Sequence, residues 1–123
     1  MFSLKGVFAC AALFAAQAFS SQALAADAKR GKTLYESRCI GCHSIDENRV
    51  GPAHRGVFGR KAGAVKGYDY SPALKSSRLT WNERTLDHWL TDPEAAIPGQ
   101  KMSFSVSDAA DRADIIAYLR TAK

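Results

Sequence analysis

A cysteine pair followed directly by a histidine, Cys39-Ile40-Gly41-Cys42-His43, constrains this chain more than any other feature. Two thiols separated by two residues on a helical turn can reach the two vinyl groups of one haem and add to them as thioethers. The adjacent histidine then projects towards the haem iron. The Cys-x-x-Cys-His pattern is typical of covalent haem attachment. It predicts haem c on Cys39 and Cys42, with His43 as an iron ligand.

Other uses of two cysteines fit the sequence less well. A thioredoxin-type dithiol belongs at a strand-to-helix junction in a βαβ unit, and this chain shows no such pattern. A structural zinc site needs four ligands, whereas His54 and His88 are isolated and far apart in the sequence. A plain disulfide would not require His43. Haem attachment is therefore the favoured interpretation of the motif.

The first 25 residues have the layout of a secretory signal peptide. Lys5 gives a positively charged start, residues 6–19 are apolar apart from Gln17, and the segment ends in the small-x-small tripeptide Ala23-Leu24-Ala25. We expect cleavage after Ala25, export to the bacterial periplasm, and a single haem domain of residues 26–123. The alternative is an uncleaved anchor, although the apolar run is shorter than the about 20 residues that span a membrane.

Cleavage would leave Cys39 and Cys42 as the only thiols and Met102 as the only methionine. A haem iron held by His and Met is an electron-transfer arrangement, because the thioether ligand raises the reduction potential. Met102 lies on an extended segment that begins at Pro98-Gly99, and we expect it to be the second iron ligand. His54 is the competing ligand, and His88 is expected at the surface.

Apolar residues recur with helical spacing, and no segment alternates as a strand does. Asp27 can cap a first helix that runs to about Arg38, and Ser71-Pro72 is a start signal for a short helix. A capping box at Thr80-Trp81-Asn82-Glu83 predicts the next helix. We expect this helix to end at Asp92-Pro93, a further turn to follow, and Asp108 to begin a terminal helix with Ile115, Ile116 and Leu119 facing inward. The predicted fold is a small all-α domain with long loops around the haem.

Several short motifs flank the haem-attachment sequence in a fixed order. They are Gly31 and Tyr35 before it, then Gly51-Pro52, Phe58-Gly59-Arg60, Gly67-Tyr68-Asp69-Tyr70, Leu79-Thr80-Trp81 and Pro98-Gly99-Gln100-Lys101-Met102 after it. This order resembles the class I cytochrome c family, which includes mitochondrial cytochrome c and its periplasmic bacterial relatives. The resemblance spans residues 27–123 and implies the all-α fold of that family, wrapped around one covalently bound haem.

The resemblance also implies further contacts to the haem. The Pro52 carbonyl would accept a hydrogen bond from the second ring nitrogen of His43, which orients the ring and raises its basicity. Arg60, Tyr70 and Trp81 would lie near a buried haem propionate, whose charge needs such partners. Trp89 would lie near the methionine ligand.

The chain departs from the family at positions around the haem. His54 stands where the family usually has a leucine against the haem, and Gln100 replaces a hydroxyl residue. Glu94 occupies a position that is lysine in mitochondrial proteins, while Lys101 and Arg38 remain from the basic ring around the haem edge. We therefore expect partner docking to differ in detail.

The sequence thus predicts a periplasmic one-electron carrier, not an enzyme, that is soluble and monomeric after cleavage. The formal net charge is +5 for the whole chain and +4 once the leader with Lys5 is removed. This charge favours respiratory or photosynthetic redox partners with acidic docking faces, such as a quinol–cytochrome c reductase, a cytochrome oxidase, a reaction centre or a dehydrogenase. Nucleic acid is not expected, because the basic residues are scattered among acidic ones. Two alternatives stay open: a subunit dedicated to one dehydrogenase, and a haem peroxidase or gas sensor in which His54 is the distal acid–base group.

Overall fold

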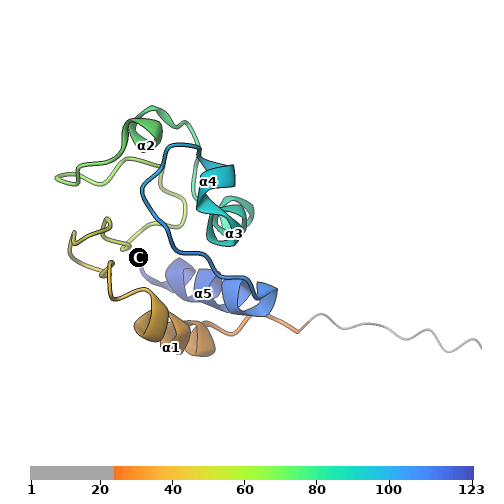
Figure 1. Cartoon of the computed structure of the whole chain (residues 1–123). Coiled ribbons are helices and arrows are strands. Elements are labelled where there is room, and N and C mark those ends of the chain that lie inside the picture. Colours follow the sequence, from red (N-terminus) through yellow and green to blue (C-terminus); the bar gives the residue numbers. More distant parts are fainter. Residues whose placement is uncertain (1–23) are drawn as a thin grey trace, which may run out of the picture.

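The computed structural model describes residues 24–123, in which helices are the regular secondary structure (Figure 1). The helices are α1 (Ala28–Arg38), α2 (Pro72–Ser76), α3 (Glu83–Thr91), α4 (Pro93–Ala96) and α5 (Ala109–Thr121). Within this range there is no strand, and Lys61 and Thr80 form only an isolated antiparallel bridge. The signal peptide predicted for residues 1–25 lies outside the described residues, apart from Leu24 and Ala25. No helix of the described part is both long and apolar enough to cross a membrane.

Short polar side chains begin three of the helices at the predicted positions. The Asp27 carboxylate accepts hydrogen bonds from the amides of residues 29 and 30 at the start of α1. Ser71 caps α2, with Pro72 in the first turn, and Asp108 caps α5. Each cap satisfies backbone N–H groups that have no partner inside the helix. The helix starts read from the sequence at these three positions are confirmed.

The start of α3 differs from the prediction, because Asn82 is the N-cap in place of Thr80. The Asn82 side-chain oxygen accepts from the Thr85 amide at 3.0 Å, and the Thr85 hydroxyl oxygen accepts from the Asn82 amide at 2.8 Å. Thr80 is instead held by its bridge to Lys61, and its carbonyl accepts from the Thr85 hydroxyl at 2.7 Å. The capping box therefore lies two residues later than predicted.

The first and last helices cross in direct backbone contact, as Figure 1 shows at one end of the molecule. A Cβ added at Gly31 of α1 would lie 1.8 Å from the carbonyl oxygen of Asp114 in α5. Only glycine permits this approach, which is the physical reason for a helix-weakening residue in mid-helix. Tyr35 and Ile115 complete the contact with side chains that are 2% and 1% exposed.

A cluster of charged side chains clamps the same crossing. Arg30 of α1 forms ion pairs with Asp111 and Asp114 of α5, and Arg38 pairs with Asp111 at 2.8 Å. The Asp114 carboxylate also accepts from the backbone amide of Asp27 at 2.7 Å. The hydrogen bond from Arg30 lowers the pKa of Asp111, and the bond from the Asp27 amide, followed by that from Arg30, lowers the pKa of Asp114. Both carboxylates are therefore held in their charged form.

The helices α2, α3 and α4 lie at the other end of the molecule (Figure 1). Helix α3 packs on α4 and on α5. An extended segment joins α4 to α5, and its Val106 amide donates to the Leu90 carbonyl at 2.7 Å. Residues of the loop 39–71, of this extended segment and of α1, α3 and α5 line a cavity, which is the candidate site.

The Gly31 contact predicts a large loss of stability on adding one methyl group. Gly31→Ala should lower the free energy of unfolding by about 2–3 kcal/mol, since the backbones of α1 and α5 must separate. Urea denaturation of the haem-loaded protein measures this. Gly41→Ala is the matched control, because a Cβ at Gly41 meets no atom of the chain within 4 Å. Equal stabilities of the two variants would contradict the proposed contact.

The lowered pKa of Asp114 predicts a specific response to acid. The unfolded chain binds protons at this carboxyl below about pH 4 while the folded chain does not, so its stabilising contribution is present above that pH and is lost as the pH falls. Asp114→Asn should therefore be less stable at neutral pH and lose less stability between about pH 4 and 2. Urea unfolding across this pH range tests it. Glu47→Gln, whose side chain makes no hydrogen bond to the described residues, should keep the wild-type slope.

Candidate functional site

Residues from most of the described chain line one cavity of about 370 Å³ between the two groups of helices. All nine predicted site residues are among them: Cys39, Cys42, His43, Pro52, Arg60, Tyr70, Trp81, Trp89 and Met102. Ile115 and Leu119 of α5 and Leu86 and Leu90 of α3 also contribute to the lining. The cavity is thus apolar over much of its wall, with a few polar groups at defined places, as expected of a cofactor site.

The two cysteines lie on a helical turn that continues α1. The Cys39 amide donates to the Tyr35 carbonyl at 2.8 Å, and the His43 amide donates to the Cys39 carbonyl at 2.9 Å. Cys39 and Cys42 are both free thiols, and burial raises the pKa of Cys39 to about 11. This turn places two free thiols and an imidazole along one wall of the cavity. In residues 24–123 no group of three or more His, Cys, Asp or Glu side chains could hold a metal ion.

The ring of His43 is held in one orientation by its neighbours. Its Nδ1 atom lies 2.9 Å from the Pro52 carbonyl oxygen, to which it donates a hydrogen bond. The backbone of Gly51 lies so close that an added Cβ would be 2.2 Å from the ring. Burial lowers the pKa of His43 more than the bond to Pro52 raises it. The imidazole is therefore neutral and keeps Nε2 available, as iron ligation requires.

His54 lies beside His43. The two rings are stacked with their centroids 4.1 Å apart and an interplanar angle of 20°, and Nδ1 of His54 is 2.8 Å from the Tyr35 hydroxyl. Burial, followed by the charges of His43 and Arg60, lowers the pKa of His54 to about 3. If His43 holds the iron, the stacked His54 ring would lie on the same side of the haem as His43. This position argues against His54 as either the opposite ligand or a distal acid–base group.

Arg60 presents a polar atom that has no partner in the described residues. Two of its guanidinium nitrogens donate to the carbonyls of Arg55 and Ala53 at 2.8 and 3.0 Å, whereas its Nε is buried without a hydrogen bond. Burial lowers the pKa of Arg60, against a raising effect of Tyr70. The Tyr70 hydroxyl oxygen accepts from the Val65 amide at 3.1 Å and can still donate its proton. An unsatisfied arginine beside a free hydroxyl donor suits an anionic group such as a haem propionate.

Two tryptophans and Met102 form a further part of the cavity wall. Trp81 is buried and meets Trp89 edge-on, with ring centroids 5.3 Å apart and an interplanar angle of 65°. Met102 is half-buried and lines the cavity from the extended segment between α4 and α5. His88 is exposed and does not line the cavity, so it is not placed to act as a ligand.

The structure adds three residues around the site that the sequence did not single out as site residues. Gly51 touches the His43 ring, Tyr35 anchors His54, and Tyr68 lines the cavity while donating to the Val50 carbonyl at 2.6 Å. Helical spacing could have identified Tyr35, because it lies one turn before the first cysteine. The other two depend on how a long irregular loop folds back, for which the sequence carries no periodic signal.

Comparison with known proteins identifies the family. A model of the family described as Cytochrome c matches residues 28–123. Cytochrome c from Gibberella zeae is 44% identical over 98 residues, which cover 76% of this chain and 92% of that protein. Cytochrome c2 from Blastochloris viridis is 41% identical over 112 residues, which cover 88% of this chain and 87% of that protein.

Solved structures agree with this assignment. Cytochrome cH from Methylobacterium extorquens superposes with a TM-score of 0.74 at 46% identity, covering 77% of this chain and 98% of that one. Ferricytochrome c2 from Rhodopseudomonas palustris also gives 0.74, at 37% identity, covering 79% and 99%. The predicted all-α fold, the resemblance to class I cytochromes c and the covalently attached haem c cofactor are confirmed, and this chain belongs to the cytochrome c family.

Proposed function

We propose that this cytochrome is a one-electron carrier of the bacterial periplasm that holds its haem through Cys39, Cys42, His43 and Met102. A haem-based electron carrier is the function typical of the family. The observation that carries the residue assignment is the single cavity onto which the free thiols, the neutral imidazole and the methionine converge. Haem supplies the reversible one-electron chemistry of its iron, and the protein residues bind and tune it.

The proposed ligand pair favours electron transfer over substrate chemistry. His43 offers Nε2 as a neutral donor, and Met102 offers a neutral thioether, which favours the ferrous state. With both axial positions taken by the chain, no position would remain for a substrate. The location of His54 supports this proposal over a peroxidase or gas sensor, because a peroxidase needs an acid–base group on the side opposite the proximal histidine.

The polar residues of the cavity would hold one edge of the haem. We assign Arg60, Tyr70 and Trp81 to a propionate, since a buried carboxylate without hydrogen-bond partners is costly. The orphaned Nε of Arg60 supports this assignment. Trp89, packed on Trp81, would face the methionine side of the haem.

The opposite edge of the haem would be the site of electron exchange. Ile40, Val50 and Phe104 are exposed apolar residues, and the latter two line the cavity. Basic side chains, Lys101 and Arg38, also line it. This combination suits brief docking with acidic redox partners, such as a quinol–cytochrome c reductase, a cytochrome oxidase, a reaction centre or a dehydrogenase. The signal peptide predicted for residues 1–25 and the bacterial cytochrome c2 relatives support a periplasmic location.

Replacement of Met102 tests the proposed ligand. Ferric wild-type protein should show the weak red charge-transfer absorption band of methionine-ligated haem, and Met102→Ala should abolish it and bind cyanide readily. Ser103→Ala, a neighbour on the same segment, should keep the band. A high-spin ferric spectrum or ready cyanide binding in the wild type would reject the closed carrier and favour the enzyme alternative.

Salt dependence tests the proposed partner class. Lys101→Ala should lower the second-order rate constant with an acidic redox partner about two- to threefold at low ionic strength, and the difference should disappear as salt screens the charges. Stopped-flow kinetics measure both effects, and Lys29→Ala on α1 is the control. Comparable rates with several candidate partners would support a free shuttle. Rapid reaction with a single dehydrogenase would instead identify a dedicated subunit.

A further inference from the structure

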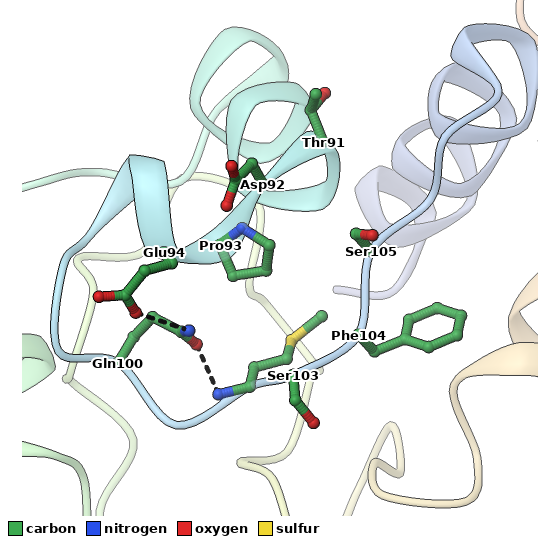
Figure 2. Close-up of a pocket in the computed structure, with 9 residues that line it drawn as sticks. Thr91, Asp92, Pro93, Glu94, Gln100, Ser103, Phe104 and Ser105 are labelled. Carbon is green, nitrogen blue, oxygen red and sulfur yellow. Dashed lines mark hydrogen bonds between the residues drawn. The ribbon is translucent and has the colours of Figure 1, made fainter.

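The segment that carries Met102 is thinly supported by packing. Ile97 and Val106 are buried at its two ends, and no residue between them is buried. Met102, Ser103 and Phe104 line the haem cavity and also line a second, open hollow of about 510 Å³ (Figure 2). The segment is thus a thin wall between two spaces. Met102 itself is partly buried against the edge of the core, so the backbone around it depends on further contacts to stay in place.

Two polar side chains, Glu94 and Gln100, form hydrogen bonds that hold the backbone of this segment. Glu94 of α4 accepts from the Gly99 amide at 2.9 Å and from the Gln100 side-chain amide at 3.2 Å. The side-chain oxygen of Gln100 in turn accepts from the Met102 amide at 2.5 Å. Figure 2 shows Glu94 and Gln100 facing each other beside the hollow, with dashed lines marking the last two bonds. Within residues 98–105, the other backbone amide bond is the one from Gln100 to the Ile97 carbonyl, at 3.2 Å.

These bonds form a continuous connection from α4 to the backbone of the proposed ligand. The Glu94 carboxylate has one oxygen on Gly99 and the other on Gln100, so it fixes the turn and the orientation of the Gln100 side chain together. The amide of Gln100 uses its donor on Glu94 and its acceptor on Met102, so neither bond can move without the other. The position of the Met102 backbone therefore depends on a residue eight positions earlier.

We propose that Glu94, acting through Gln100, is a positioning residue that holds Met102 at the haem iron. The inference rests on the proposed ligation by Met102. Loss of either side chain frees the Met102 amide and enlarges the set of conformations open to the segment. Conformations in which the thioether lies away from the iron then become more populated, and an external ligand can bind to them.

Imidazole binding to the ferric haem-loaded protein measures that population. Glu94→Ala and Gln100→Ala should each raise the apparent affinity for imidazole by about three- to tenfold, the effect of losing one or two net hydrogen bonds. The double variant should bind imidazole no more than about twofold more tightly than Gln100→Ala alone, because the two residues act in series. The intensity of the red charge-transfer band provides a second readout.

A comparison of variants separates positioning from simple charge effects. Glu94→Gln keeps one acceptor oxygen where Glu94 uses two, so it cannot accept from both the Gly99 amide and the Gln100 side chain, and its imidazole affinity should rise about as much as that of Glu94→Ala. Gln100→Ala keeps the Glu94 charge, so a raised affinity in that variant is not a charge effect. Glu47→Ala removes an exposed carboxylate elsewhere and should have no effect. Wild-type affinity in both Glu94→Ala and Gln100→Ala, or wild-type affinity in Gln100→Ala while the two Glu94 variants bind imidazole more tightly, would overturn the proposal.

The Met102→Ala variant distinguishes this failure from failure of the proposed ligand. If the wild-type band disappears in Met102→Ala while the Glu94 and Gln100 variants behave as wild type, Met102 is the ligand and only the positioning role is rejected. If the wild type lacks the band and Met102→Ala does not alter its spectrum, the ligand assignment and the positioning role are both rejected.

Discussion

The close crossing of α1 and α5 determines where the haem-attachment residues lie. Because Gly31 has no side chain, the α1 backbone rests against the carbonyl of Asp114, and the turn that follows α1 continues directly from this crossing. Cys39 and His43 lie on that turn, while Ile115 and Leu119 of α5 contribute to the cavity wall. A side chain at residue 31 would push α1 away from α5. The turn that carries Cys39 and His43 would then move relative to the other walls of the cavity. The ion pairs around the crossing also fix how α1 and α5 are aligned along their lengths.

The two sides of the haem site are held by different kinds of interaction. His43 is confined by the Pro52 carbonyl, the Gly51 backbone and the stacked ring of His54, so packing and one hydrogen bond leave it little freedom. Met102 lies on an exposed segment whose hydrogen bonds come partly from side chains. An electron carrier needs its two iron ligands, here proposed to be His43 and Met102, to stay in place through the redox cycle. The methionine side is therefore where substitutions should most readily alter ligation.

Local signals in the sequence predicted the start of most helices and the type of cofactor. Asp27, Ser71 and Asp108 cap helices because their short polar side chains reach free amides within three residues, a property that needs no tertiary contact. Thr80 failed as a cap because Lys61, distant in the sequence, holds it in extended backbone. The resemblance to a known family supplied the expected hydrogen bond from His43 to Pro52, which spacing alone would not have predicted.

By itself the sequence determined the attachment motif, the single available methionine and the helical character of the chain, because these depend on residue type and short spacing. Tertiary structure decided what those residues touch. It placed His54 against His43, left Arg60 with an unpaired Nε, and joined Glu94 to the Met102 segment through Gln100. None of these contacts leaves a periodic trace in the sequence, because each depends on how irregular loops fold back over the crossed helices.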